Sequence, residues 1–247
     1  MKYLIGNWKI NLTLKESIGL ANKLTKETKE RNKNLIMALC PSFVSLSEVS
    51  KIIKKSPIVL GAQDVFWEER GAFTGEVSVR ELKELGVQYV IIGHSERRHV
   101  TGESDETVAR KMQQALHSSL RPILCVGETL AERNNGVAER VVGHQLRTVF
   151  ENISEASARK ILIAYEPVWA IGTGTPCTPD DALSMLVLIR KMIAEKFGDV
   201  KVPILYGGST DNRNVALYAE VGFDGALVGG SSLKATTFLQ MKDQLLA

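Results

Sequence analysis

Short apolar runs alternate with longer amphipathic stretches along the whole chain. Each run has the length of a strand and is almost continuously apolar, whereas a half-exposed strand would alternate apolar and polar residues. The pattern therefore predicts strands that are buried on both faces. The runs cover residues 3–6, 35–39, 58–61, 89–93, 122–126, 161–165, 202–206 and 225–228.

The stretches between these runs carry signals for the start of a helix. Thr13-Leu14-Lys15-Glu16 and Ser78-Val79-Arg80-Glu81 both have the spacing of a capping box. Thr178-Pro179-Asp180-Asp181 offers an N-cap, a proline in the first turn and negative charge at the positive end of the helix dipole. We expect helices to begin at all three places.

Strands and helices that alternate in this way require a parallel sheet. Roughly eight such units that close on themselves form a (β/α)₈ barrel, which typically needs about 250 residues. The chain has 247 residues and shows no linker, so we expect residues 1–247 to form one eight-stranded parallel barrel domain. An open, doubly wound sheet is the alternative.

Composition narrows the classes of partner. The apolar share is 44%, the charged share 24% and the formal net charge +3, which gives no reason to expect nucleic acid or an anionic membrane as a partner. The N-terminus becomes polar too early for a signal peptide, and the three cysteines lack the spacing of a metal site. We expect a cytoplasmic protein that needs neither a metal nor another cofactor.

Barrel enzymes carry their chemistry at the carboxyl ends of the strands, so the residues that leave each run are the candidates. Lys9 follows the first run and could neutralise a phosphate or an oxyanion, although a surface lysine is the simpler interpretation. His94 follows the fourth run, and a helix that starts at Ser95 would favour its neutral form. Arg97 and Arg98, next along the chain, are more typical of an ion-pair network than of catalysis.

Glu166 leaves the sixth run beside apolar neighbours. A carboxylate in such surroundings is a stronger base than one in water, although a salt-bridged or capping glutamate is an equally simple interpretation. Residues 170–175 follow, rich in glycine and bounded by Pro167 and Pro176, which is typical of a lid. Gly172-Thr173-Gly174 lacks the third glycine of a dinucleotide fingerprint.

Glycine pairs follow the last two runs, in Gly207-Gly208-Ser209-Thr210 and Gly229-Gly230-Ser231-Ser232. Such loops expose backbone N–H groups, and phosphate sites of barrels commonly form from the loops after strands seven and eight. A single Gly-Gly turn would be weak evidence, but two in these places predict a phosphate site.

Further motifs accompany these strand ends. They are Gly6-Asn7-Trp8-Lys9, Ala72-Phe73-Thr74-Gly75-Glu76, Ile92-Gly93-His94-Ser95-Glu96-Arg97-Arg98, Cys125-Val126-Gly127-Glu128, Ala164-Tyr165-Glu166-Pro167-Val168-Trp169-Ala170-Ile171-Gly172-Thr173-Gly174, Tyr206-Gly207-Gly208-Ser209 and Val228-Gly229-Gly230. Together they resemble the triosephosphate isomerase family across the whole chain, and the stretch around Glu166 is highly specific.

The resemblance implies an isomerase of glycolysis and gluconeogenesis that interconverts dihydroxyacetone phosphate and D-glyceraldehyde 3-phosphate. Glu166 would be the base, and His94 the neutral electrophile that moves protons between the enediolate oxygens; this pairing is a known example of the family's chemistry. Glu96 would support them. The resemblance further implies that substrate is bound by Asn7, Trp8, Lys9, Gly172, Ser209, Gly229 and Gly230.

The resemblance also implies a homodimer. The loop that begins at Phe66 and ends at Glu76 is long for a strand-to-helix connection, and Thr74 at its tip would lie beside Asn7 and Lys9 of the second subunit. A self-contained surface loop is the alternative.

The hinge Thr175-Pro176-Cys177 departs from the usual pattern of the family. Because Pro176 fixes φ, we expect the departure to affect the motion of the lid and not the groups that transfer protons. Two other functions remain open on the sequence: another enzyme of phosphate-binding barrels, and a protein that binds a phosphate ligand without catalysis.

Overall fold

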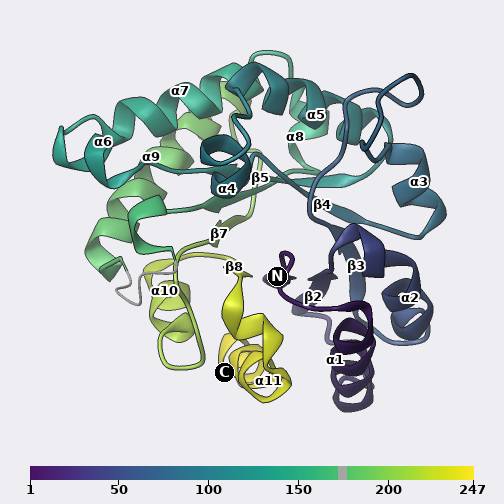
Figure 1. The fold of residues 1–247 in the computed structure, drawn as a ribbon. Helices are drawn as coiled ribbons and strands as arrows, with labels where there is room; N and C mark the ends of the chain where they lie inside the picture. Colours follow the sequence, from purple (N-terminus) through teal and green to yellow (C-terminus); the bar gives the residue numbers. More distant parts are fainter. Residues whose placement is uncertain (172–176) are drawn as a thin grey trace.

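The computed structural model describes residues 1–171 and 177–247. Its eight strands close into a parallel barrel in chain order, with helices around the outside (Figure 1). The strands are β1 (Lys2–Asn7), β2 (Leu35–Cys40), β3 (Val59–Ala62), β4 (Tyr89–Ile92), β5 (Arg121–Val126), β6 (Leu162–Tyr165), β7 (Ile204–Tyr206) and β8 (Gly225–Val228). The predicted barrel is confirmed.

Closure occurs where the first strand meets the last. Tyr3 of β1 pairs with Ile36 of β2 on one side and with Gly225 of β8 on the other. This contact excludes the open, doubly wound sheet. The first and last helices, α1 and α11, consequently lie beside each other (Figure 1).

Helices fill the connections between strands and cover the barrel. Short 3₁₀ turns, η1 (Val168–Ala170) and η2 (Gly230–Leu233), follow β6 and β8. The α-helices are α1 (Leu14–Glu27), α2 (Phe43–Ile53), α3 (Val79–Glu84), α4 (Ser95–His99), α5 (Asp105–His117), α6 (Leu130–Asn134), α7 (Ala138–Phe150), α8 (Glu155–Ala158), α9 (Pro179–Phe197), α10 (Val215–Val221) and α11 (Ala235–Leu246). In the described part of the chain, none is both long and apolar enough to cross a membrane.

The three predicted helix starts are confirmed. The Thr13 hydroxyl accepts from the Glu16 N–H, and the Glu16 carboxylate accepts from the Thr13 N–H at 2.8 Å. Ser78 begins α3 with the same reciprocal pair, and Thr178 begins α9 by accepting from the Asp181 N–H. Each cap satisfies backbone donors that have no partner within the helix.

Burial on both faces explains the continuous apolar runs. Alternate residues of one strand point into the barrel or out towards the helices, as Ile5 and Leu4 do in β1, and both are fully buried. The seventh strand is shorter than predicted and begins at Ile204. Pro203, which has no N–H, precedes it, and only its carbonyl pairs, accepting from Ile163 at 2.9 Å.

Candidate active site

Lys9 follows β1 in a backbone conformation that is rare for a residue with a side chain. Its φ of 53° lies in the left-handed region, and two polar side chains hold it there. The Lys9 N–H donates to Asn7 Oδ1 at 3.2 Å, and Gln63 Nε2 donates to the Lys9 carbonyl at 2.9 Å. The ammonium reaches Glu96 Oε1 at 2.5 Å and passes beside Gly229. Lys9 is therefore a fixed positive charge at the mouth of the barrel.

His94 sits at the junction of β4 and α4. Gly93 makes the turn with a φ of 70°, and His94 caps the helix that begins at Ser95, as expected from the sequence. Its Nδ1 accepts a hydrogen bond from the Glu96 N–H at 3.2 Å. An imidazole nitrogen that accepts carries no proton, so we infer the neutral tautomer with its proton on Nε2. This N–H faces the interior of the site.

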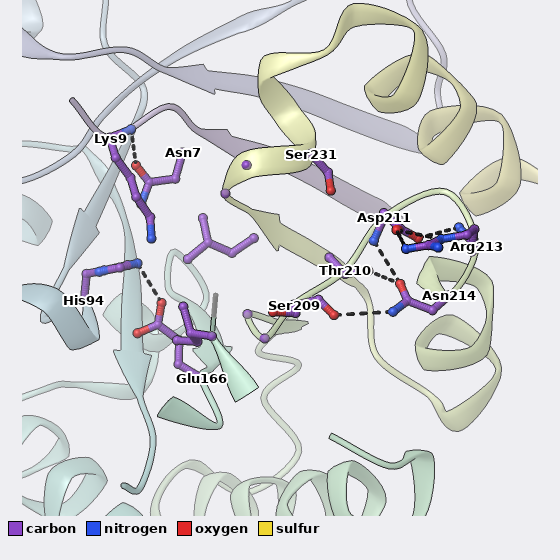
Figure 2. Close-up of a pocket in the computed structure, with 16 residues that line it drawn as sticks. Asn7, Lys9, His94, Glu166, Ser209, Thr210, Asp211, Arg213, Asn214 and Ser231 are labelled. Atoms are coloured by element: carbon purple, nitrogen blue, oxygen red, sulfur yellow. Dashed lines mark hydrogen bonds and ion pairs between the residues drawn. The ribbon is translucent and has the colours of Figure 1, made fainter. Parts of the chain in front are cut away.

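Glu166 follows β6, and its carboxylate is almost completely buried. Its Oε2 accepts from the Ser95 N–H at 2.8 Å. Its Oε1 lies 3.1 Å from His94 Nε2, close enough for an electrostatic contact but without the alignment of a hydrogen bond. Figure 2 shows Lys9, His94 and Glu166 converging from three strands on one space.

That space is a cavity of about 560 Å³ at the carboxyl end of the barrel. Lys9, His94 and Glu166 line one side of it, and the loops after β7 and β8 line the other (Figure 2). Seven residues predicted from the sequence share this cavity: Asn7, Lys9, His94, Glu166, Ser209, Gly229 and Gly230. A carboxylate, an imidazole, an ammonium and two glycine loops can thus reach one small molecule.

Comparison with known proteins assigns the chain to a family. The family model for triosephosphate isomerase matches residues 2–245. The chain belongs to the triosephosphate isomerase family. It is 47% identical over 242 residues to the triosephosphate isomerase of Caldanaerobacter subterraneus subsp. tengcongensis and 45% identical over 242 residues to that of Thermoanaerobacter pseudethanolicus, with 96% of this chain and 97% of each relative covered. It is 46% identical to the enzyme named triosephosphate isomerase in Alkaliphilus metalliredigens, with 96% of each chain covered. The predicted resemblance and the isomerase class are confirmed.

Not every residue implied by the triosephosphate isomerase resemblance lies on the cavity. Trp8 packs in the hydrophobic core, is 1% exposed and is not among the residues that line the cavity, so its contact with substrate stays a prediction. Glu96 lies at the edge of the site and contacts Lys9. Thr74 lies on an exposed loop. Gly172 and most of the predicted lid, including the hinge residues Thr175 and Pro176, fall outside the described residues.

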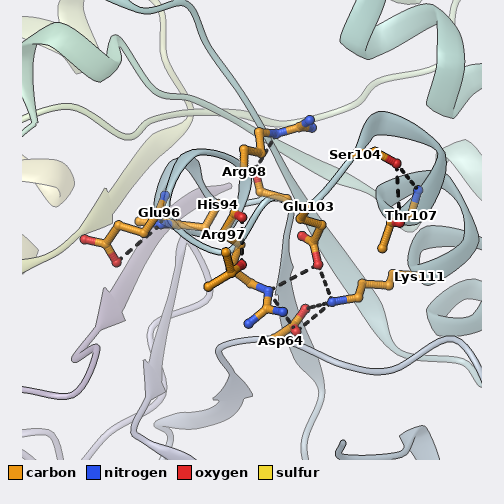
Figure 3. A network of polar contacts seen from close by, with 11 residues as sticks. Asp64, His94, Glu96, Arg97, Arg98, Glu103, Ser104, Thr107 and Lys111 are labelled. Carbon is orange, nitrogen blue, oxygen red and sulfur yellow. Dashed lines mark hydrogen bonds and ion pairs between the residues drawn. The ribbon is translucent and has the colours of Figure 1, made fainter.

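A network of buried charges supports the helix that His94 caps (Figure 3). Lys111 is 1% exposed, and its ammonium contacts both oxygens of Asp64, at 2.8 and 2.7 Å, and also Glu103. Arg97 Nε joins them at 2.9 Å from Asp64 Oδ2 and 3.2 Å from Glu103 Oε1. Burial raises the pKa of Asp64 above its usual value, and Lys111 partly offsets this effect. The network links the segment after β3 to α4 and α5.

Arg98 contributes to a separate set of contacts. Its Nε donates to the Gly93 carbonyl at 2.7 Å, and its Nη1 pairs with Asp105. The sequence-based expectation that Arg97 and Arg98 form ion pairs is confirmed. Both side chains hold the turn that presents His94.

A second buried carboxylate, Glu128, organises the segment that follows Glu166. Its oxygens accept from the Trp169 Nε1–H at 2.8 Å and from the Tyr165 hydroxyl at 3.1 Å. Arg133 lies 3.3 Å from Glu128 Oε1 and stacks over the Trp169 ring. Burial, followed by the charge of Glu128, raises the pKa of Tyr165.

The structure adds residues that the sequence did not indicate. Gln63 holds the Lys9 backbone through a hydrogen bond to the Lys9 carbonyl. It could have been found in the sequence as a polar residue at the carboxyl end of a strand. Arg213 and Asn214 line the end of the cavity formed by the loop after β7, where Asn214 Oδ1 accepts from the Asp211 N–H at 2.9 Å. No group of three or more His, Cys, Asp or Glu side chains among the described residues is arranged to hold a metal ion.

Proposed function

We propose that this chain interconverts dihydroxyacetone phosphate and D-glyceraldehyde 3-phosphate. The convergence of Glu166 and His94 Nε2, 3.1 Å apart beside Lys9, carries the proposal. A protein that only binds phosphate needs no base. An aldose–ketose isomerase needs a base that moves a proton between two carbons and a donor that moves a proton between their oxygens. Membership of the triosephosphate isomerase family agrees with this choice of substrate.

The proton transfers follow from the roles of two residues. Glu166 removes a proton from C1 of dihydroxyacetone phosphate, and the electrons move through C1–C2 to the carbonyl oxygen to form an enediolate. His94 donates its Nε2 proton to that oxygen and takes the proton of the O1 hydroxyl. Glu166 then returns its proton to C2, which gives the aldehyde and restores both side chains.

Lys9 would stabilise the negative charge that develops on the enediolate oxygens. A fixed ammonium at the mouth of the barrel costs no reorganisation during the reaction, which is the condition for effective electrostatic catalysis. Asn7 holds the Lys9 backbone at 3.2 Å and also lines the cavity, so we assign it a role in both positioning and binding. Glu96, 2.5 Å from the ammonium, orients it.

The phosphate would sit at the opposite side of the cavity. Backbone N–H groups of Ser209, Gly229 and Gly230 are the proposed donors, because these loops line the cavity and Gly230 begins η2. The first turn of a helix carries partial positive charge and donors that suit a phosphate. We propose that the backbone N–H of Gly172, which lies outside the described residues, also donates to the phosphate.

The decisive experiment compares the purified, chelator-treated chain with its Glu166→Gln variant. The wild type should convert glyceraldehyde 3-phosphate, and the variant should lose at least about 10²–10⁴-fold in kcat while a substrate analogue still binds. Glutamine keeps the size of the side chain and one oxygen that can accept from the Ser95 N–H, so the loss would report the missing base.

Two results would overturn the proposal. A folded wild type that binds substrate without turnover would be a phosphate-binding protein. A Glu166→Gln variant with wild-type kcat would assign the base to another residue.

We also propose that residues 1–247 act as one domain in a cytoplasmic homodimer of central sugar metabolism. Ile10, next to Lys9, is 91% exposed, and Val44 in α2 and Val100 after α4 are 82% and 80% exposed, so apolar side chains are exposed in the connections that follow β1, β2 and β4. Residues 68–76 of the loop 66–76 are exposed as well, and Phe73, which is 43% exposed, packs on the buried Phe66. Thr74→Arg should convert the dimer to monomers in sedimentation velocity and lower kcat. An unchanged sedimentation coefficient would refute this interface.

A further inference from the structure

A second large cavity lies at the amino end of the barrel, opposite the proposed active site. It measures about 880 Å³, which is large enough for a small organic ligand. The starts of strands line it, including Tyr89 of β4 and Arg121 of β5, whereas Glu166 and His94 follow the ends of strands. Because all eight strands are parallel, the two cavities occupy opposite faces.

Positive charge dominates the wall of this cavity. Its charged residues come from the last residue of α1, from the segments that follow α1 and α2, from the start of β5 and from α11. The cations are Lys29, Arg31, Lys55, Arg121 and Lys242, and the carboxylates are Glu27 and Glu30. A concave surface lined mainly by one sign of charge concentrates the field and attracts counter-ions.

These cations have few internal partners. Lys242 pairs with its neighbour Asp243 at 3.1 Å, and the structure gives the other four no ion pair with any described residue. Lys111, by contrast, is a buried cation that Asp64 compensates. An anion bound in the cavity would relieve the repulsion between the unpaired charges.

The Arg121 side chain is held in a fixed orientation by Tyr89. Its Nη1 donates to the Tyr89 hydroxyl at 2.8 Å, and its guanidinium stacks over the Tyr89 ring at 5.2 Å. Tyr89 itself is 2% exposed and packs inside the barrel. A guanidinium has five N–H donors in a fork that fits phosphate and carboxylate groups, so an immobilised one loses little entropy on binding.

We propose that the cavity at the amino end of the barrel binds a small anion with at least two negative charges, carried by phosphate or carboxylate groups. Arg121 provides the oriented donors, and Lys55 and Lys242 provide further positive charge. The cavity is separate from the proposed triose phosphate site, because no residue lines both cavities.

The test uses the full chain with labelled isoleucine, leucine and valine methyl groups, observed by NMR. Ile36 and Val59 line the cavity at the amino end, whereas Ile171 and Leu227 line the active-site cavity, so each site has its own reporters. Pyrophosphate and citrate serve as probes for phosphate and carboxylate groups. We expect the shifts of Ile36 and Val59 to change and to saturate with at least one probe, and the affinity to fall as NaCl increases.

Arg121→Gln should weaken this binding about tenfold or more, the scale of one lost hydrogen bond to a charged group, without changing KM for glyceraldehyde 3-phosphate. Lys55→Gln, at an exposed position, should weaken it by a smaller factor and serves if the first variant does not fold. The matched control is Lys51→Gln on α2, whose cation pairs with Glu48 outside the cavity. Absent or unsaturable shifts at Ile36 and Val59, or equal affinity in Arg121→Gln and wild type, would overturn the proposal.

Discussion

Gly207 has no side chain at a point where Glu166 leaves no room for one. A Cβ at this position would lie 2.8 Å from Glu166 Cγ and 3.1 Å from the Tyr165 carbonyl oxygen. Carbon atoms in contact are about 3.5–4.0 Å apart, so Gly207→Ala must displace the Glu166 side chain by about 1 Å. If Glu166 is the base, as we propose, a displacement of this size costs about 10²-fold in rate, or about 2.7 kcal/mol in activation free energy.

The assay is steady-state conversion of glyceraldehyde 3-phosphate, with urea unfolding run in parallel. We expect kcat to fall about 100-fold in Gly207→Ala and the free energy of unfolding to fall by about 1–3 kcal/mol, as in other overpacked cores. Gly19→Ala is the matched control, because an added Cβ on this exposed face of α1 meets nothing within 4 Å. It should keep kcat and gain about 0.5–1 kcal/mol of stability.

A folded Gly207→Ala variant whose kcat stays within about threefold of the wild type would refute this reasoning. Such a result would mean that the carboxylate accommodates the methyl group without losing its position, or that Glu166 is not the group whose position sets the rate.

Two further predictions concern stability. Lys111→Met should lower the free energy of unfolding in urea by about 3–5 kcal/mol, because it leaves the buried carboxylates of Asp64 and Glu103 without their shared cation. The control is Lys51→Met at an exposed position. A loss below about 1 kcal/mol in Lys111→Met, equal to that of the control, would contradict this prediction. Burial raises the pKa of Cys177 to about 12, so between about pH 8.5 and 12 the folded chain keeps a proton that the unfolded chain loses, and stability should fall as pH rises. The decrease in urea midpoint from pH 7.5 to 9.5 should therefore be smaller in Cys177→Ala than in the wild type, and equal decreases in both would show that this thiol does not contribute.

The local elements could be predicted from the sequence because their causes are local. A capping box needs two residues three positions apart, so Thr13 and Ser78 mark helix starts without knowledge of the rest of the chain. Strands buried on both faces are continuously apolar, which made all eight recognisable. Once the order of strands was known, the rule that chemistry lies at their carboxyl ends indicated Lys9, His94 and Glu166.

Tertiary structure alone decided how these residues meet. The contact between Glu166 Oε2 and the Ser95 N–H joins residues 71 positions apart, and no local pattern encodes it. Trp8, which directly follows β1, belongs to the most recognisable motif at the first strand end, yet it packs in the hydrophobic core and is 1% exposed. The cavity around Arg121 is equally non-local, since its wall comes from segments far apart in the sequence. Hydrophobic periodicity fixes which residues are buried, but only the closure of the barrel sets the distances between the polar groups that remain at its two ends.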